Sequence, residues 1–138
     1  MLPNWLDDLL FKNLKAKYCP SYVDMTNIDD DRDKTLNYLG TYFPRSYSEA
    51  YCIFDSFFIN FGNSYASKEE LSIFDFGSGT GGEIFGLLVV LNEQCPKLKK
   101  IRIVALDGNK EALLLYEEIL DVFRSRISII PKFRSTLV

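Results

Sequence analysis

The chain has 138 residues, a net charge of −3 and no histidine. This length suits one domain with a substantial core, and its 47% hydrophobic and 25% charged residues are typical of a folded protein. Without histidine, histidine-based catalytic triads and mixed cysteine–histidine zinc sites are excluded, and an acidic chain has no general attraction for nucleic acid.

Three cysteines, Cys19, Cys52 and Cys95, lack the close spacing of metal or redox motifs, so we expect no metal site. Their odd number indicates free, mostly buried thiols in a reducing compartment, and we expect a cytoplasmic protein. The sequence does not begin like a signal peptide, and no run approaches the length of a membrane span. We therefore expect no membrane association.

Residues 1–66 are predicted to form an N-terminal helical region. An apolar stripe over 5–18 predicts a helix that begins after Pro3 and ends near residues 19–20. The acidic stretch 27–34 lacks the glycine and the distal glutamate of a calcium loop. It therefore predicts a solvated loop followed by the cap of a helix over 35–42.

A second, aromatic helix is predicted to start at Pro44, because proline suits the first position of a helix. Aromatic residues recur at three- and four-residue steps and predict a face that packs on the sheet. They are Tyr47, Tyr51, Phe54, Phe58 and Phe61.

The chain is organised around an apolar run at 71–76, a loop with four glycines, and a helical pattern over 83–94. This order predicts strand, turn and helix. Glycines allow positive φ and leave no Cβ between backbone and ligand, and the start of the helix offers unpaired N–H groups. The stretch therefore predicts a cradle for a small ligand.

A second strand is predicted over 101–106, ending at Asp107, an acidic position of the kind that binds a ribose in nucleotide-binding units. Asn109 is expected to cap a helix that runs to about residue 124. A third strand is predicted over 126–130, before Pro131, and the tail 132–138 carries no prediction. Right-handed crossovers then give the strand order third, second, first in a parallel sheet.

The glycine loop fits two classes of ligand. Gly77, Gly79 and Gly82 satisfy the dinucleotide fingerprint, which indicates an NAD-type ligand. Asp75, however, lies two residues before the first glycine, where its charge would repel a pyrophosphate and attract a cationic amino-acid ligand. The sequence therefore favours the cationic ligand, with an NAD-binding oxidoreductase fragment as an alternative.

The block Asp-Phe-Gly-Ser-Gly-Thr-Gly at 75–81, with Leu-Asp-Gly-Asn-Lys-Glu-Ala-Leu at 106–113, resembles the cofactor-binding half of class I S-adenosylmethionine-dependent methyltransferases. The resemblance implies that Asp75 and the backbone of Gly77, Ser78, Gly79, Thr80 and Gly81 face the methionine part. It also implies that Asp107 takes the ribose hydroxyls, that Gly108 and Asn109 lie near the adenine, and that Arg45 and Tyr47 touch the cofactor's carboxylate.

We therefore expect one compact α/β domain in which residues 67–138 form a partial Rossmann-like unit with three parallel strands. The family's acceptor-side motif follows a fourth strand, which this sequence does not reach, so we expect a truncated fold that self-associates through its free first-strand edge. No catalytic residue can be assigned, and we expect little activity from the chain alone. A non-catalytic protein-interaction module on the same scaffold is the other alternative.

Overall fold

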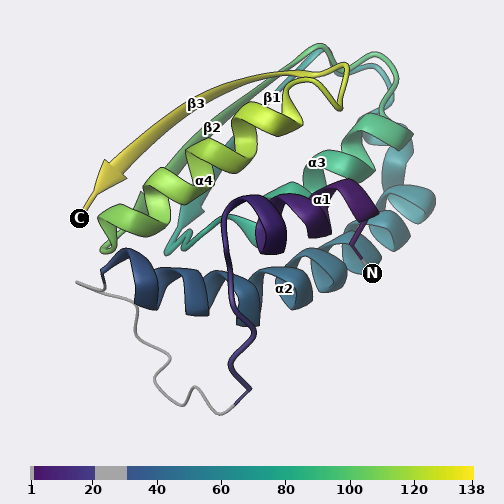
Figure 1. Ribbon diagram of the computed structural model, residues 1–138. Coiled ribbons are helices and arrows are strands. Elements are labelled where there is room, and N and C mark those ends of the chain that lie inside the picture. Colours follow the sequence, from purple (N-terminus) through teal and green to yellow (C-terminus); the bar gives the residue numbers. More distant parts are fainter. Residues whose placement is uncertain (1, 21–30) are drawn as a thin grey trace.

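The computed structural model describes residues 2–20 and 31–138, and it has the predicted α/β architecture (Figure 1). Three parallel strands form one sheet in the order β1-β2-β3, as predicted. Their bounds are Glu70–Phe76 for β1, Lys100–Asp107 for β2 and Ile130–Leu137 for β3.

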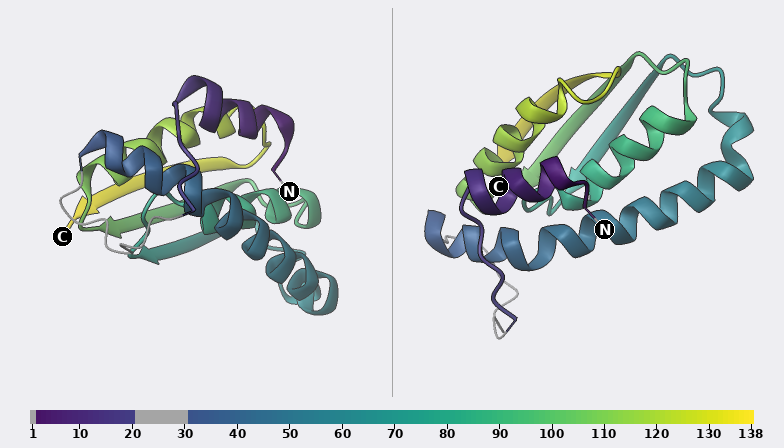
Figure 2. Two further views of the ribbon diagram at one scale, coloured as in Figure 1. Left: turned by 60° about the horizontal axis from the view of Figure 1, so that its bottom comes forward. Right: turned by 45° about the vertical axis from the view of Figure 1, so that its right-hand side comes forward.

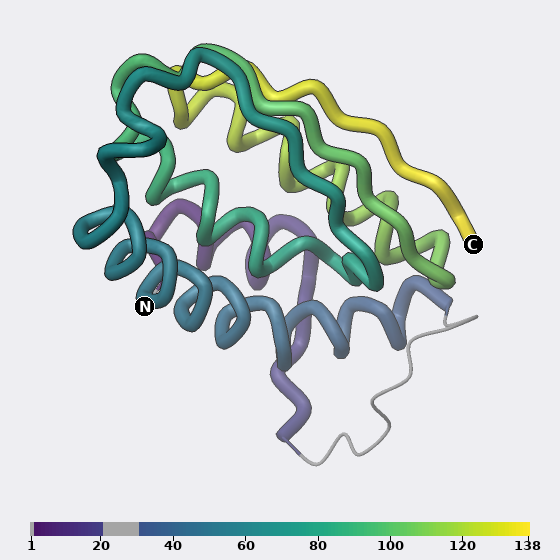
Figure 3. Tube along the Cα trace, turned by 180° about the vertical axis from the view of Figure 1, so that it is seen from behind, coloured from purple at the N-terminus to yellow at the C-terminus, as the bar shows by residue number. Residues whose placement is uncertain are grey.

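The two crossover helices, α3 (Gly82–Gln94) and α4 (Lys110–Phe123), cover the same face of the sheet (Figure 2). Both connections run from one strand to the next in the same direction across the sheet, and right-handed crossovers then place both helices on one side. The burial pattern of β2 agrees with helices on one face only, because Ile101, Ile103 and Ala105 are buried while Arg102 is exposed. Seen from behind, the strands lie in front of α3 and α4 (Figure 3).

A single 30-residue helix, α2 (Arg32–Phe61), packs along α3 and is followed by a short 3-10 turn, Gly62–Ser64. The sequence predicted two helices separated at Pro44, and this prediction was wrong. Proline removes only one N–H from the helix, and packing against α3 holds the rest of α2 together. Asp31 caps α2 by accepting a hydrogen bond from Lys34 N at 2.8 Å, as predicted for the acidic stretch. Asp29 and Asp30 lie outside the described residues.

The N-terminal helix is shorter than predicted. It consists of α1 (Asn4–Asp8) and a π-helical turn, η1 (Leu9–Asn13). Lys15 then adopts a left-handed conformation with φ of 65°, and Ala16 N reaches back to Leu10 O at 2.9 Å. A left-handed residue of this kind ends a helix. The left-handed residue at the end of a helix is usually glycine. A lysine at this position therefore does not indicate a helix end in the sequence.

The third strand was predicted too early, over 126–130 instead of Ile130–Leu137. The sequence predicts that the strand ends before Pro131, yet this residue lies inside β3 and is paired with Ile101 of β2. Proline is tolerated on an edge strand, because the N–H that it lacks can be one that faces away from the sheet. The Pro131 carbonyl accepts a hydrogen bond from Arg124 Nη1 at 2.5 Å.

The three cysteines are free, as predicted, but only Cys95 is buried, while Cys19 is half-buried and Cys52 is exposed. The predicted aromatic face of α2 is also only partly correct. Tyr47 and Phe58 are buried, whereas Phe61 is 64% exposed. Within the described part of the chain, no helix is long and apolar enough to cross a membrane.

The close approach of α2 and α3 depends on Gly86, because a Cβ there would lie 2.5 Å from the Tyr47 backbone oxygen. We expect Gly86→Ala to lower the free energy of unfolding by about 1–3 kcal/mol, despite alanine's better helix propensity. Gly62→Ala is the matched control, since its Cβ would meet only the Phe58 side chain at 3.8 Å. Urea denaturation that finds the two variants equally stable would contradict this packing.

Candidate ligand site at the carboxyl edge of the sheet

The loop between β1 and α3 carries three glycines in the left-handed region, Gly77, Gly79 and Gly81, with φ of 63°, 52° and 83°. Two backbone hydrogen bonds shape the loop: Ser78 N donates to Leu106 O at 3.0 Å, and Gly81 N donates to Ser78 O at 2.9 Å. Gly81 is the N-cap residue of α3, and no side chain caps this helix. The loop therefore presents bare backbone at the positive end of α3.

Asp107, at the end of β2, holds this loop in place. One carboxylate oxygen accepts a hydrogen bond from Gly79 N at 2.7 Å, and the other accepts from Asn109 N at 2.8 Å. The side chain is buried. Asp107 thus bridges the carboxyl ends of the two strands, and its hydrogen bonds go to the protein's own backbone rather than to an open surface.

Asp75, near the end of β1, has a different environment. It is half-buried, and Asp75 Oδ2 accepts a hydrogen bond from the Tyr116 hydroxyl at 3.2 Å. Burial raises the Asp75 pKa from its ordinary value of 3.8 to about 6; the Tyr116 hydrogen bond opposes the rise, and the charges of Glu83 and Asp107 add to it. Asp75 is therefore a carboxylate that a nearby cation would stabilise.

A small cavity beside the loop, which we call the glycine-loop hollow, encloses about 90 Å³. Asp75, Glu83 and the loop backbone form one side of it, and α2 forms the other through Tyr38, Tyr42, Phe43 and Ser46. Ser78 Oγ, in the wall of the hollow, is buried and has no hydrogen-bond partner among the described residues. The hollow thus combines acidic charge with an unsatisfied polar atom.

The hollow is too small for a nucleoside cofactor as it stands, because sites for ligands of that size enclose about 300–1,000 Å³. Tyr38 from α2 lines it and packs on the glycine loop: a Cβ on Gly79 would lie 3.2 Å from the Tyr38 hydroxyl. The Tyr38 ring contacts the Tyr42 ring with centroids 5.0 Å apart. The acidic lining of the hollow suits a cationic group, and a whole nucleoside cofactor needs more room than the hollow encloses.

The predicted site residues do not all meet at the hollow. Asp75 and the loop residues Gly77, Ser78, Thr80 and Gly81 line it, whereas Gly79, Asp107, Gly108 and Asn109 do not. The Asn109 side chain is occupied instead. It caps α4 by accepting from Glu111 N at 2.9 Å, and it donates to Thr35 Oγ1 at 3.0 Å inside the core.

Arg45 and Tyr47 also lie away from the hollow. Arg45 is exposed and paired with Glu49 at 2.8 Å, while Tyr47 is buried, which raises its pKa to about 12. Sequence reasoning missed Tyr38, Tyr42 and Ser46, which actually line the hollow from α2. Two of these are aromatic residues four apart in the first half of α2, and that spacing is the only signal that could have found them.

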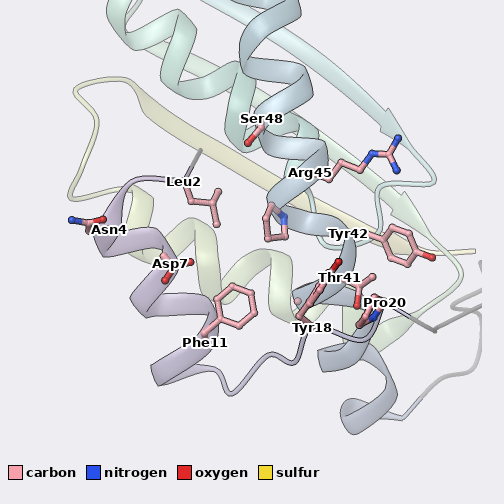
Figure 4. Close-up of a pocket in the computed structure, with 12 residues that line it drawn as sticks. Leu2, Asn4, Asp7, Phe11, Tyr18, Pro20, Thr41, Tyr42, Arg45 and Ser48 are labelled. Atoms are coloured by element: carbon pink, nitrogen blue, oxygen red, sulfur yellow. The ribbon is translucent and has the colours of Figure 1, made fainter.

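A larger groove of about 820 Å³ lies between α1 and α2 (Figure 4). Phe11, Tyr18 and Asp7 line it from the N-terminal segment, and Tyr42 and Arg45 line it from α2. Tyr42 therefore belongs to the walls of both the groove and the hollow.

Protonation of Asp75 should make the free energy of unfolding depend on pH. Because its pKa is higher in the folded chain than in the unfolded chain, its stabilising contribution is complete below pH 3.8 and is lost as the pH rises through about 6. The unfolding free energy of the wild type, minus that of Asp75→Asn, should therefore fall between about pH 5 and about pH 7. Urea denaturation of both proteins at the two pH values measures this difference in unfolding free energy. If the difference stays constant or grows with pH, the raised pKa of Asp75 is contradicted.

Comparison with protein-family models and with curated proteins finds no match to this chain. The resemblance to methyltransferases therefore depends on the two sequence blocks quoted above. The architecture and the hollow are the structural observations from which a function must be inferred.

Proposed function

We propose that the chain is the S-adenosylmethionine-binding portion of a class I methyltransferase, with the sulfonium and ammonium groups of the cofactor held at the glycine-loop hollow. The observation that supports this most is Asp75, a half-buried carboxylate beside three glycines in the left-handed region. When ionised, its negative charge favours a cationic over an anionic ligand at this point. The cofactor supplies an electrophilic methyl group, and this chain supplies binding and orientation.

The residues have separate roles in this proposal. Asp75 faces the cationic part of the ligand, and Gly77 and Gly81 allow close approach to the loop backbone because glycine has no Cβ. Ser78 Oγ offers a hydrogen bond that it does not make within the described protein. Asp107 acts indirectly, by fixing the loop through Gly79 N.

Cofactor binding should depend on pH in a direction set by Asp75. A bound cation stabilises the ionised carboxylate, so affinity for S-adenosylmethionine should rise as the pH rises through about 6, and Asp75→Asn should abolish most of this rise. Calorimetric titration at two pH values measures the effect. NAD provides the contrast, since its pyrophosphate would bind less well as Asp75 ionises. Binding of NAD alone would support the oxidoreductase alternative and overturn the proposal.

Removal of the Tyr38 ring should open the hollow. We expect Tyr38→Ala to bind S-adenosylmethionine at least about tenfold more tightly than wild type, because the variant need not displace the ring. Tyr18→Ala is the control, since Tyr18 is 67% exposed and lines the groove but not the hollow. Equal affinities of both variants and the wild type, with all three folded by circular dichroism, would count against Tyr38 as the closing group.

A non-catalytic interaction module is the second candidate, and a specific observation favours it. One face of the parallel sheet carries exposed aromatic side chains, including Phe74 at 57% and Phe76 at 75% exposure. Parallel sheets are normally covered on both faces. This surface does not depend on the hollow, so both functions can belong to the same chain.

A further inference from the structure

The face of the sheet opposite α3 and α4, which we call the bare face, is apolar over the carboxyl halves of β1 and β2. Phe74 and Phe76 point to this face with ring centroids 4.6 Å apart, and the register places Val104 and Leu106 beside them. No described helix covers this side, which faces the viewer in Figure 3. The bare face is therefore an exposed apolar patch on a type of sheet that is usually buried on both sides.

The bare face is basic over β3. Arg102, Lys132 and Arg134 alternate with the buried residues of β2 and β3 and are exposed. Among the described residues, none of these three cations forms a salt bridge. Two cations, Lys132 and Arg134, follow each other on the same face of β3, and Arg102 lies beside Lys132 in the register. The patch thus has an apolar side and a positively charged side.

The dimensions of the bare face match one helix. Three strands about 4.8 Å apart span about 10 Å between the outer two, which is the diameter of a helix with its side chains. The eight residues of β2 extend about 26 Å, the length of a helix of about 17 residues. A single amphipathic helix lying along the strands would cover the patch.

We propose that the bare face binds an acidic amphipathic helix of a partner protein. The apolar stripe of that helix packs on Phe74, Phe76, Val104 and Leu106, and carboxylates on its flank lie over Lys132 and Arg134. A second copy of this chain is a poorer occupant. Two bare faces packed together would bring their cations into one desolvated interface, and like charges in such a position oppose association.

The test uses the full chain and a pair of synthetic peptides of about 17 residues. Both carry leucines on one helical stripe; one has glutamates along the flank, and the other has lysines at the same positions. We expect the chain to bind the glutamate peptide at least about tenfold more tightly than the lysine peptide in fluorescence anisotropy. Equal affinities, a preference for lysine, or no binding of either peptide would overturn the proposal.

Two variants locate the binding. Lys132→Glu with Arg134→Glu should reverse the preference between the peptides, and Phe74→Ser with Phe76→Ser should weaken binding of the glutamate peptide more than about tenfold. The control is Ile53→Ser with Ile59→Ser, two α2 residues that are 66% and 68% exposed, and it should change nothing. If the phenylalanine variant does not fold, the charge-reversal variant decides the question alone. An unchanged peptide preference in it would overturn the proposal.

Two further measurements address the other possible occupants. Sedimentation of the chain alone should give the same association state for the wild type and for Phe74→Ser with Phe76→Ser; a dimer abolished by these two changes would make a second copy the occupant. A single-stranded RNA oligonucleotide should bind more weakly than the glutamate peptide. Tighter RNA binding that is lost in Lys132→Glu with Arg134→Glu would assign the face to nucleic acid. Either of these results would overturn the proposal.

Discussion

Asp107→Asn is expected to lower the free energy of unfolding by about 2–4 kcal/mol, because a buried group that accepts two backbone hydrogen bonds loses at least one of them. The carboxylate accepts from Gly79 N with one oxygen and from Asn109 N with the other. An asparagine amide has one oxygen and one NH₂ group, so its NH₂ group would face a second donor. Urea denaturation of the variant measures the loss.

Glu117→Gln is the matched control for this prediction. Glu117 is an exposed carboxylate on α4, and its change should alter stability by less than about 0.5 kcal/mol. If Asp107→Asn were as stable as this control, the carboxylate would not hold the loop. The same reasoning makes Asp107 a poor probe of cofactor binding, because its loss damages the loop whether or not a ribose binds there. Asp75→Asn is the better probe.

Gly81→Ala is expected to be the other strongly destabilising change, by at least about 3 kcal/mol. Two effects add: the residue has φ of 83°, and its Cβ would lie 2.6 Å from Tyr116 Cε2. Tyr116 is fully buried and cannot move away easily. A loss of this size is a large share of the stability of a small domain, and thermal unfolding followed by circular dichroism measures it.

Gly77→Ala separates the two effects in Gly81→Ala. Gly77 has φ of 63°, but a Cβ there would have no atom within 4 Å. The free energy of unfolding of this variant should fall only by the cost of a left-handed backbone for alanine, about 1–2 kcal/mol. If Gly77→Ala and Gly81→Ala were equally destabilised, the packing of Tyr116 against the loop would have no energetic effect.

The parallel order of the three strands could be predicted, because apolar runs, glycine punctuation and crossover handedness all depend on local sequence. Asn109 could be predicted as a cap for the same reason, and its side chain does accept from Glu111 N and Ala112 N. Two of the errors in the fold came from proline. Pro44 lies inside α2 and Pro131 inside β3, where tertiary packing and an edge position outweigh the local preference.

The candidate site was only half predictable. The loop and Asp75 carry a motif, so they could be found from the sequence. Tyr38 and Tyr42 come from a helix far away in the chain, and nothing local indicates that α2 crosses the loop at that point. The role of Asp107 also needed coordinates, because a strand-end carboxylate can face either a ligand or the protein's own backbone.

The most direct test of the proposed cofactor site is the amide NMR spectrum of the chain during titration with S-adenosylmethionine. The site predicts shifts concentrated on Asp75, on the loop amides of Gly77 to Gly82 and on Tyr38, with little change at the end of α2 or in β3. In Asp75→Asn the same shifts should require more ligand. An unchanged spectrum at about 1 mM ligand, or shifts confined to other parts of the chain, would contradict the proposed site.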